Sequence, residues 1–528
     1  MTKFRSSHPQ TINSIFLATV QASPDRVYLD FAGDAFTYAR MGREVESLAR
    51  GLHALGLKRG DRAVTLLETG PDSIISWYAV NRLGAIHVPI NTAYKGDYLR
   101  HQINDSGARI VICENAFVPH VTAIASQLTS VEHILHLGAE ADRRDWRGGF
   151  GPIDEHRLTH GDAPYVEVAP SDLAAIIYTS GTTGLSKGCM ASHNYLCDLA
   201  RRNSEAAGRV PDDIQWTSLP LFHVGGICVV LQAIQLRASA SVSRKFSVSG
   251  FWPEMERSKA THIMLIGSAA QMLANAPDTP LSLRCRGQIR ILTAVPMSGQ
   301  LAATWRERFG VNWSTGFVYG STECGQALSA PYNEPAPDGS CGRANDAFDV
   351  RIVDEHDEEL PANQVGEIVT RPKRPNVMYS GYWNNPEATA KASRNLWHHM
   401  GDQGRMDENG NVFFVDRSKD VIRRRGENIS TFELEGTFGQ NPYIAEVAVH
   451  SVPSELLEDD VKVTAVLLSG TQLKESDLWE WARARIPRFA VPRYVEFRNE
   501  LPRNATGRVL KFQLREEGVT KATWDSQN

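Results

Sequence analysis

The sequence predicts an α/β protein that has a large N-terminal domain and a small C-terminal α+β domain. Over the first two-thirds of the chain, short apolar runs alternate with helical stretches, as buried parallel strands alternate with crossover helices. Short strands separated by turns begin near Gly342, and strands mixed with an amphipathic helix begin after Arg417. We therefore expect two domains, at residues 1–417 and 418–528.

The first two-thirds of the chain is predicted to form two doubly wound α/β subdomains. The stretch NYLCDLARRNSEAAG is typical of a helix, and five apolar runs have the length of buried strands: RAVTLL, ARIVIC, LAAIIYT, THIMLI and IRILTAV. A passage rich in Gly, Pro and charged residues, from about Gly138 to Pro170, is predicted to connect the two subdomains at the surface.

The remaining third is predicted to contain more antiparallel β structure. The alternating stretches FDVRIVD and GEIVTRP favour antiparallel strands packed beside the α/β core, and we expect a β-barrel-like subdomain there. From about Ser418, AEVAVHSVP and VKVTAVLL are typical of strands, and KESDLWEWARARI is typical of an amphipathic helix. These stretches predict the small α+β domain.

The composition is that of an ordinary globular enzyme. Of the 528 residues, 42% are hydrophobic and 22% are charged, and the formal net charge is -5 without an acidic or basic tail. Nucleic acid is therefore not an expected partner. The N-terminus lacks the pattern of a signal peptide, and no apolar stretch approaches about 18 residues, so we expect a cytoplasmic protein without a membrane partner. The seven cysteines show no CxxC or zinc-like spacing, which favours reduced thiols.

The strongest motif is YTSGTTGLSKG, from Tyr178 to Gly188, which follows the apolar run LAAII and precedes a helix. Glycines, hydroxyl side chains and a lysine form a flexible loop rich in donors, as polyphosphate binding requires. The Walker spacing is absent, which disfavours an ordinary P-loop NTPase, and the alternative is a plain surface loop. The residues expected to bind ATP are Thr179, Ser180, Gly181, Thr182, Thr183, Gly184 and Lys187.

At this motif the chain resembles the adenylate-forming superfamily of acyl-CoA synthetases, peptide-synthetase adenylation domains and luciferases. Further matches follow in the family's order over nearly the whole chain: YGSTE, GDQGRMDENG, DRSKDVIRRRGENIS and LPRNATGRVLKFQLRE. The resemblance implies that ATP or AMP and CoA are substrates. It also implies that the small C-terminal domain is mobile and pivots near Lys419 between two half-reactions.

The resemblance assigns nucleotide-binding roles to residues far apart in the sequence. In YGSTE, Tyr319 would lie against adenine, Thr322 would contact the α-phosphate and Glu323 would hold Mg²⁺, and Gly320 is expected among the nucleotide-binding residues. A hard cation beside phosphates takes oxygen ligands, which a carboxylate supplies. Asp402 and Arg417 would contact the ribose.

The resemblance also assigns residues to CoA. Gly426, Glu427 and Asn428 would line the pantetheine tunnel, and the run Arg423, Arg424 and Arg425 would pair with the anionic CoA nucleotide. The alternative for these arginines is a solvated charged face.

The acyl site is expected around PLFHVGG. His223 lies where the family places a residue that guards this site, although a core histidine is the alternative. Small residues in the matching stretches leave room for a bulky, largely apolar acid, although glycines also serve turns and close packing. These residues are Gly225, Gly226, Gly267, Ala269 and Ala270.

The chain departs from the family pattern at Arg508, where the family has the lysine that contacts the substrate carboxylate and the α-phosphate during adenylation. Lys511 lies three residues further on and is expected to belong to the next element. Arginine's planar fork does not replace a compact ammonium, and the loss of one transition-state donor costs about 3–4 kcal/mol. We therefore expect impaired adenylation but competent thioesterification, with a separate adenylating ligase as the expected supplier of acyl-AMP.

Smaller departures also cluster at the predicted nucleotide site. Ser186 replaces a usual proline, Met400 replaces a common threonine, and Ala294 and Val295 stand where glycine and a small or acidic residue often meet adenine. The chain resembles the crotonobetaine/carnitine-CoA ligase-like branch through RRRGENIS. The change at Arg508 is similar to that in non-adenylating acyl-CoA ligases of bacterial diterpenoid biosynthesis, which implies secondary metabolism.

Three alternatives to a half-reaction ligase stay open. A conventional two-step acyl-CoA synthetase would tolerate Arg508. An adenylating enzyme would load a carrier protein, and a non-catalytic relative would only bind an acid or a nucleotide. The presence of Glu323, Asp402, Arg417 and the Gly426 segment disfavours the non-catalytic alternative.

Overall fold

The computed structural model has a mixed α/β fold with a large N-terminal part and a small C-terminal part, which confirms the predicted fold class. The chain divides into two compact units. The larger unit contains residues 1–92, 102–178 and 188–416, and the smaller unit contains residues 93–101, 179–187 and 417–528. The structure describes residues 9–138, 141–161, 163–179, 185–295, 297–316, 318–334, 336–417, 421–455, 458–503 and 509–527.

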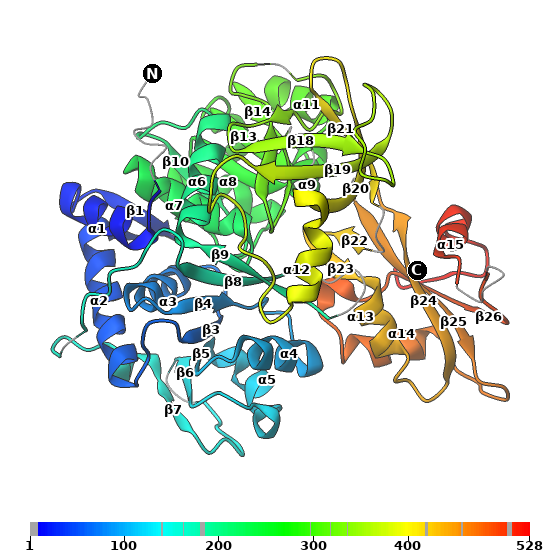
Figure 1. Ribbon diagram of the computed structural model, residues 1–528, viewed down its shortest axis with the longest axis horizontal. Helices are drawn as coiled ribbons and strands as arrows, with labels where there is room; N and C mark the ends of the chain where they lie inside the picture. The colour runs from blue at the N-terminus through cyan, green and yellow to red at the C-terminus, as the bar shows by residue number, and fades with distance from the viewer. Residues whose placement is uncertain are drawn as a thin grey trace. The chain divides into compact units, whose positions relative to one another are not determined.

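The first sheet of the larger unit has seven strands in the order β7-β6-β5-β3-β4-β8-β9. Helices α3 (Pro71–Arg82) and α2 (Tyr38–Ala54) pack together, and α3 contacts β3 and β4 (Figure 1). The passage predicted as a plain connection contributes the edge strand β7, which pairs with β6 in parallel. The strands are β3 (Arg62–Leu66), β4 (Ile86–Pro89), β5 (Ile110–Glu114), β6 (His133–Leu137), β7 (Gly149–Pro152), β8 (Leu173–Thr179) and β9 (Lys187–Ser192).

The second sheet also has seven strands, in the order β14-β13-β12-β10-β11-β1-β2. Its N-terminal strand β1 pairs in parallel with β11, which lies about two hundred residues later in the chain, and Leu29 is the partner of Ala240. The strands are β1 (Val27–Phe31), β2 (Asp34–Thr37), β10 (Ile214–Thr217), β11 (Ser239–Val242), β12 (His262–Ile266), β13 (Ile291–Val295) and β14 (Trp313–Thr315).

One hydrophobic core joins these two sheets. It contains buried residues of β3 and β8 from the first sheet, of β1 and β11 from the second, and of several helices. Leu48, Trp77, Leu196 and Val230 are among them, and all four are almost completely buried. The helices of this core are α2, α3, α6 (His193–Ala206) and α7 (Val224–Leu236), against which α1 (Ile12–Ala22) packs.

A second core covers the other face of the second sheet. Trp216 of β10 lies at 5.3 Å from Phe251 in an edge-to-face arrangement, and Trp305 lies at 4.8 Å from Phe309. All seven cysteines are free thiols, and six of them are buried. The helices of this core are α8 (Val248–Ser258), α9 (Gly267–Asn275), α10 (Pro280–Arg284) and α11 (Gly299–Phe309).

The rest of the larger unit forms a three-stranded and a four-stranded sheet, in which the pairs whose register is defined are antiparallel. Helix α12 (Pro386–Ala392) precedes β20 in the chain. The three-stranded sheet consists of β15 (Val318–Ser321), β16 (Gly325–Ser329) and β17 (Arg343–Ala344). The four-stranded sheet consists of β18 (Phe348–Val353), β19 (Gly366–Pro372), β20 (His398–Met406) and β21 (Val412–Arg417).

The smaller unit combines a hairpin, a four-stranded sheet and helices around its own core. Within the described residues, no helix is both long and apolar enough to cross a bilayer. The strands of the smaller unit are β22 (Val421–Arg424), β23 (Glu427–Ser430), β24 (Ile444–Pro453), β25 (Asp459–Leu467), β26 (Tyr494–Arg498) and β27 (Trp524–Asp525). Its helices are α13 (Thr431–Phe438), α14 (Glu475–Arg483) and α15 (Lys511–Glu517).

A buried ion pair ties the end of the chain to the sheet of the smaller unit. Lys462 of β25 donates from Nζ to Glu496 Oε2 of β26 at 2.6 Å and to the Gly518 carbonyl at 2.7 Å. The same carboxylate oxygen accepts the hydroxyls of Thr520 and Thr523 at 2.8 and 2.7 Å. The other carboxylate oxygen, Oε1, accepts Arg498 Nε at 2.6 Å, so Lys462 is one of two cations that compensate the buried Glu496.

We expect Lys462→Met to lower the free energy of unfolding by about 1.5–3 kcal/mol, because the buried carboxylate then keeps only one of its two cations, Arg498. Urea denaturation followed by circular dichroism measures the change. The matched control is Arg483→Met, which removes an exposed cation paired with Glu480 and should change the free energy by about 0.5 kcal/mol or less. Equal effects of the two substitutions would contradict the role given to this pair.

The same site predicts a dependence of stability on pH. Burial opposes ionisation of Glu496, but hydrogen bonds from Lys462, Thr523, Thr520 and Arg498 outweigh burial and lower its pKa to about 2. A carboxyl with a depressed pKa stabilises the fold above its unfolded value of 4.5, and this stability is lost as the pH falls towards 2. Between pH 6 and pH 3 the urea midpoint of the wild type should therefore fall more than that of Lys462→Met.

Candidate active site

The predicted phosphate loop connects β8 to β9. Thr179 is the last residue of β8, and its hydroxyl donates to the carbonyl of Lys187, the first residue of β9, at 3.5 Å. Tyr178 donates to Asp105 Oδ2 at 2.6 Å, which anchors the strand before the loop. The residues of the loop that lie outside the described part of the chain are Ser180, Gly181, Thr182, Thr183 and Gly184.

Ser186 supplies a hydrogen bond that the usual proline lacks. Its backbone N–H donates to Glu433 Oε1 of α13 at 2.9 Å, and its carbonyl lies 2.8 Å from His101 Nε2, with all three residues in the smaller unit. A proline has no N–H to donate. Burial raises the pKa of Glu433 to about 7, although the Ser186 hydrogen bond opposes this shift. The departure at Ser186 therefore adds a contact to the segment.

Two of the predicted nucleotide-binding residues meet through a hydrogen bond. Tyr319 of β15 donates from its hydroxyl to Asp402 Oδ2 of β20 at 2.6 Å, although 83 residues separate them in the chain. Both side chains are half-buried, so both keep a solvent-facing surface. Hydrogen bonding fixes the carboxylate in one orientation, as recognition of a diol requires.

The hairpin between β15 and β16 leaves no room for a side chain at Gly320. A Cβ there would lie 1.5 Å from the Gly325 carbonyl oxygen, so the position requires glycine. Thr322 is held through its carbonyl, which accepts the buried Tyr195 hydroxyl of α6 at 2.8 Å. The YGSTE segment thus has a fixed backbone.

Glu323 is the best-supported candidate for a metal ligand. Its Oε1 accepts the Tyr382 hydroxyl at 2.7 Å, and its backbone carbonyl accepts the Tyr379 N–H at 2.7 Å. Burial opposes ionisation, but His398 and the hydrogen bonds from Tyr382 and Ser321 together lower the pKa of Glu323. An ionised carboxylate is therefore present at neutral pH.

The donor set fits Mg²⁺ bound partly by substrate. Among the described residues no group of three or more His, Cys, Asp or Glu side chains converges on one point. Mg²⁺ in phosphoryl-transfer sites is typically held by one or two carboxylates, with the remaining oxygens from phosphates and water. A single ionised Glu323 meets that requirement.

Tyr382 and His398 were not found by sequence reasoning. The Tyr379 and His398 rings lie 5.2 Å apart, and Tyr379 also lies 5.1 Å from Tyr382. These aromatic residues come from a loop and a strand that lie 56 or more residues after Glu323 in the chain. The tyrosine-rich stretch MYSGYW was the one signal available, and its spacing does not point to YGSTE.

The residues predicted for the acyl site surround the start of α7. His223 is the N-cap residue of this helix, and its ring lies 4.7 Å from Phe222. The two glycines that follow differ. A Cβ at Gly225 would meet only side-chain atoms, Leu219 Cδ1 at 3.3 Å and Met264 Cε at 3.8 Å, whereas a Cβ at Gly226 would lie 2.3 Å from the Pro220 carbonyl oxygen.

The other small residues of the predicted acyl site lie on α9. Gly267 is the first residue of this helix, and Ala269 and Ala270 are buried in the core that α9 shares with α11. In α7, by contrast, Gly226 serves close packing of the backbone because its Cβ would meet a carbonyl oxygen, whereas Gly225 borders movable side chains.

The segment predicted to bind CoA begins in the two-residue turn between β22 and β23 and continues into β23. Arg425 and Gly426 have φ angles of 53° and 81°, as this tight hairpin turn demands. Glu458 accepts both of their backbone N–H groups, at 3.1 Å from Gly426. Glu427 begins β23 and is half-buried, and Asn428 is the next residue of this strand.

The arginine run does not present three free cations. Arg424 is buried, pairs with Asp460 at 3.0 Å and donates to the carbonyls of Phe489 and Val491. Arg425 is exposed at the turn. Arg424 is thus a structural residue of the smaller unit, whereas the exposed Arg425 stays a candidate for binding an anionic ligand.

The segment near the C-terminus is described on both sides of Arg508. Arg508 and the hinge residue Lys419 lie outside the described residues, and Arg417 is the last residue of β21. Arg503 and Val509 form an isolated antiparallel bridge, and Arg503 pairs with Glu446. Lys511 Nζ lies 2.8 Å from Glu435 Oε1 and 2.9 Å from Thr431 Oγ1 of α13. Lys511 is the first residue of the next element, α15, as the sequence predicts.

The three other departures from the family pattern lie within packed strands. The Met400 sulfur lies 3.7 Å from Cys324 Sγ and 3.8 Å from Thr370 Oγ1. Ala294 is buried in β13, and Val295 is the half-buried last residue of that strand.

Comparison with known proteins places the chain in a family. The family model of AMP-binding enzymes matches residues 16–383, and that of the AMP-binding enzyme C-terminal domain matches residues 433–508. The crotonobetaine/carnitine–CoA ligase of Salmonella paratyphi A is 28% identical over 486 residues, which cover 91% of this chain and 93% of the ligase.

Solved structures share the fold. A double mutant of o-succinylbenzoate CoA synthetase from Bacillus subtilis superposes with a TM-score of 0.81 at 22% identity, covering 96% of this chain and 98% of that one. An amide bond synthetase from Marinactinospora thermotolerans gives a TM-score of 0.84 at 24% identity, covering 95% and 99% of the two chains. From the family match over more than half of its length, the chain belongs to the AMP-binding enzymes and is an AMP-forming acid–thiol ligase.

Proposed function

We propose that this enzyme joins a bulky, largely apolar carboxylic acid to CoA through an acyl-AMP intermediate. A carboxylic acid, ATP and CoA are the substrates of the enzyme class to which the chain belongs. The observation that carries the proposal is the geometry of the segment from Tyr319 to Glu323, within the hairpin of β15 and β16. The first residue of this segment holds Asp402 at 2.6 Å, and its last is held by Tyr382 at 2.7 Å. A ribose and a phosphate-bound cation would then sit at neighbouring places on one segment.

In the first half-reaction the substrate carboxylate attacks the α-phosphorus of ATP and pyrophosphate leaves. We assign the ribose to Asp402 and Arg417, the adenine to Tyr319 and Gly320, and the α-phosphate to Thr322. Glu323 would hold Mg²⁺, which neutralises phosphate charge when bound. The residues from Thr179 to Lys187 would wrap the leaving pyrophosphate. Orientation and charge neutralisation carry this step.

In the second half-reaction the CoA thiolate attacks the acyl carbonyl and AMP leaves. We assign Gly426, Glu427 and Asn428 to the pantetheine arm and Arg425 to the CoA nucleotide. The turn that carries them is held in place by Glu458, which supports this role. A pivot of the C-terminal domain (residues 418–528) near Lys419 would exchange this segment for the Arg508 loop.

We further propose that adenylation is slow because Arg508 stands at the lysine position. A guanidinium is planar and larger than an ammonium, so it does not reproduce the contact of a lysine with two substrate groups. The engagement of Lys511 supports the proposal, because its ammonium would have to leave Glu435 and Thr431 to replace the missing lysine. Thioesterification uses other residues and would be spared.

We expect the wild type to make CoA thioester from a synthetic acyl-adenylate but to turn over acid plus Mg·ATP slowly. Arg508→Lys should raise the rate with acid plus ATP by about 10²–10³ and leave the rate with the adenylate nearly unchanged. Thioester formation with bulky apolar acids, followed by chromatography, measures both rates. If the prediction holds, a separate adenylating ligase would have to supply the acyl-adenylate to the wild type.

Arg503→Lys is the matched control, because it makes the same exchange at the base of the same loop, where Arg503 pairs with Glu446. This variant should not gain activity with ATP. Wild-type turnover of acid and ATP at the rate of the adenylate reaction would overturn the proposed impairment and leave a conventional acyl-CoA synthetase.

The two glycines of α7 allow a separate test of the acyl site. Gly225→Leu should lower kcat/KM for bulky acids relative to small ones, because its side chain would enter the space beside Leu219 and Met264. Gly226→Ala should instead lower the thermal midpoint, because its Cβ meets a backbone oxygen at 2.3 Å. Activity profiles over acids of increasing size and thermal denaturation measure the two effects. An unchanged size preference in Gly225→Leu would place the acyl site elsewhere.

A further inference from the structure

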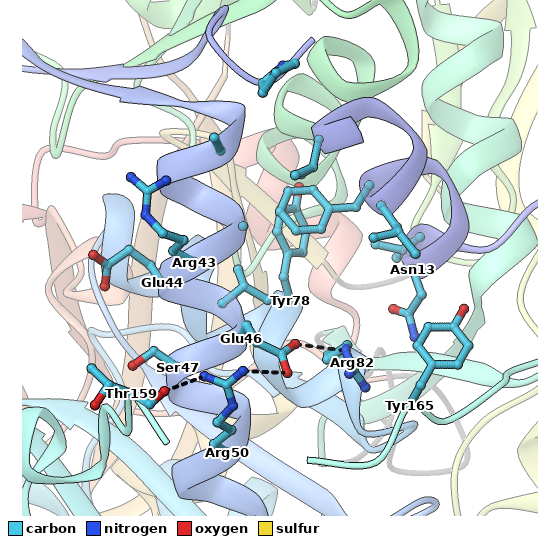
Figure 2. Close-up of a pocket in the computed structure, with 18 residues that line it drawn as sticks. Asn13, Arg43, Glu44, Glu46, Ser47, Arg50, Tyr78, Arg82, Thr159 and Tyr165 are labelled. Carbon is cyan, nitrogen blue, oxygen red and sulfur yellow. Dashed lines mark hydrogen bonds and ion pairs between the residues drawn. The ribbon is translucent and has the colours of Figure 1, made fainter. Parts of the chain in front are cut away.

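The larger unit contains a cavity that none of the proposed catalytic residues lines. It has a volume of about 800 Å³ and lies between α1, α2 and α3, beside Thr159 and Tyr165 (Figure 2). Cavities that hold small molecules in proteins typically measure about 300–1,000 Å³. The volume is therefore sufficient for a ligand of drug or lipid-fragment size.

The wall of the cavity is mainly apolar. Residues of α1 at helical spacing face the side of α2 that carries Gly42, where an added Cβ would lie 3.1 Å from Val20 Cγ1. Leu17 and Tyr165 at the cavity are 44% and 56% exposed, so apolar side chains at this cavity also face solvent. The main apolar residues of the wall are Ile12, Phe16, Leu17, Val20, Val45 and Tyr78.

Two of the three arginines at the cavity are occupied. Arg50 and Arg82 share Glu46, at 3.6 and 3.2 Å, as Figure 2 shows. Arg50 also donates to the Thr159 carbonyl at 3.2 Å, and the Arg82 guanidinium lies 5.1 Å from the Tyr165 ring. These arginines fasten the wall of the cavity and are not free to bind a ligand.

Arg43 differs from the other two. It is exposed, lies one helical turn before Glu46 on α2 and lines the cavity, and it has no hydrogen bond or ion pair with the described part of the chain. The neighbouring Glu44 is taken by Arg157 at 3.1 Å. The cavity therefore offers a ligand one unpaired cation beside an apolar wall.

We propose that this cavity binds an amphiphilic carboxylate, an apolar chain or ring with one ionised carboxyl group. The carboxylate pairs with Arg43, and the apolar body lies against Phe16, Val20 and Tyr78. A single free guanidinium selects one anionic group, since a doubly charged ligand would bring an unpaired charge to the apolar wall. The site is separate from the catalytic centre, and the inference does not depend on the proposed function.

Titration calorimetry with dodecanoate, using the full chain without ATP or CoA and a concentration below micelle formation, tests the site. We expect saturable binding at this cavity that Arg43→Glu weakens by about ten-fold or more, because a charge-assisted hydrogen bond becomes a repulsion. Arg43→Lys should restore the affinity to within a few-fold. Ala39→Phe, which fills the cavity from α2, should weaken binding and keeps Arg43. Dodecanol, which has the same chain and no charge, should bind more weakly than dodecanoate.

Arg40→Glu is the matched control, because Arg40 lies on the same helix but pairs with Asp34 at 2.6 Å and does not line the cavity. Its affinity for dodecanoate should equal that of the wild type. Gly225→Leu, which obstructs the proposed acyl site, should also leave this binding intact. Thermal midpoints within a few degrees of the wild type show that each variant is folded.

Three results would overturn the inference. The first is the absence of dodecanoate binding by the wild type. The second is equal binding of dodecanoate and dodecanol, which would remove the role of Arg43. The third is binding that survives Arg43→Glu and Ala39→Phe but is lost in Gly225→Leu, which would place the ligand in the acyl site.

Discussion

The hydrophobic core shared by the two seven-stranded sheets is the constraint on which the candidate active site depends. Buried residues of α2, α3, α6 and α7 pack against strands of both sheets, so the two sheets share one apolar core. This core fixes the start of α7, where His223 and the two glycines lie, and the end of β8, where the phosphate loop begins. It also holds Tyr195, whose hydroxyl secures the Thr322 carbonyl. Apolar burial thus positions polar groups that do not touch one another.

Charged groups at the candidate site are held in place by neighbouring residues. Asp402 accepts Tyr319, Glu323 accepts Tyr382, and Glu458 accepts the backbone of the Gly426 turn. Each carboxylate is therefore oriented before any ligand arrives, which removes reorganisation at the moment of reaction. The partners come from separate elements, so the two sheets of the β-rich region must be folded before these residues meet. The contacts of Asp402 and Glu323 rest on the tertiary structure of the larger unit, whereas those of Glu458 rest on that of the smaller unit.

Departures from the family pattern have different physical consequences at different positions. Ser186 adds a backbone donor, and Met400 packs against a buried thiol, so both fit their surroundings. Lys511 is engaged by two side chains of α13 and is not available for another role. We propose that Arg508 is the departure with a direct consequence for chemistry, because the resemblance places at this position a lysine that contacts the reacting groups. We infer that substitutions around the nucleotide are tolerated when packing absorbs them.

The sequence by itself determined the fold class and the order of the motifs. Periodicity located β3, β5, β8, β12 and β13, because a buried parallel strand is a continuous apolar run whatever its neighbours are. The glycine-rich loop was recognisable because its residues are consecutive. The same local signals missed β1, whose partner β11 lies about two hundred residues away, and they described β7 as a connection.

Only the tertiary structure decided which predicted residues meet and which serve packing. The pairs Tyr319–Asp402 and Tyr382–Glu323 are separated by 83 and 59 residues, and no spacing rule links such positions. Gly226 and Arg424 look like binding residues in the sequence, yet one makes room for a carbonyl and the other is buried in an ion pair. The cavity at Arg43 likewise arises where three helices fail to fill the space between them. A sequence records the character of each side chain, whereas contacts and cavities depend on distances between segments that only the folded chain brings together.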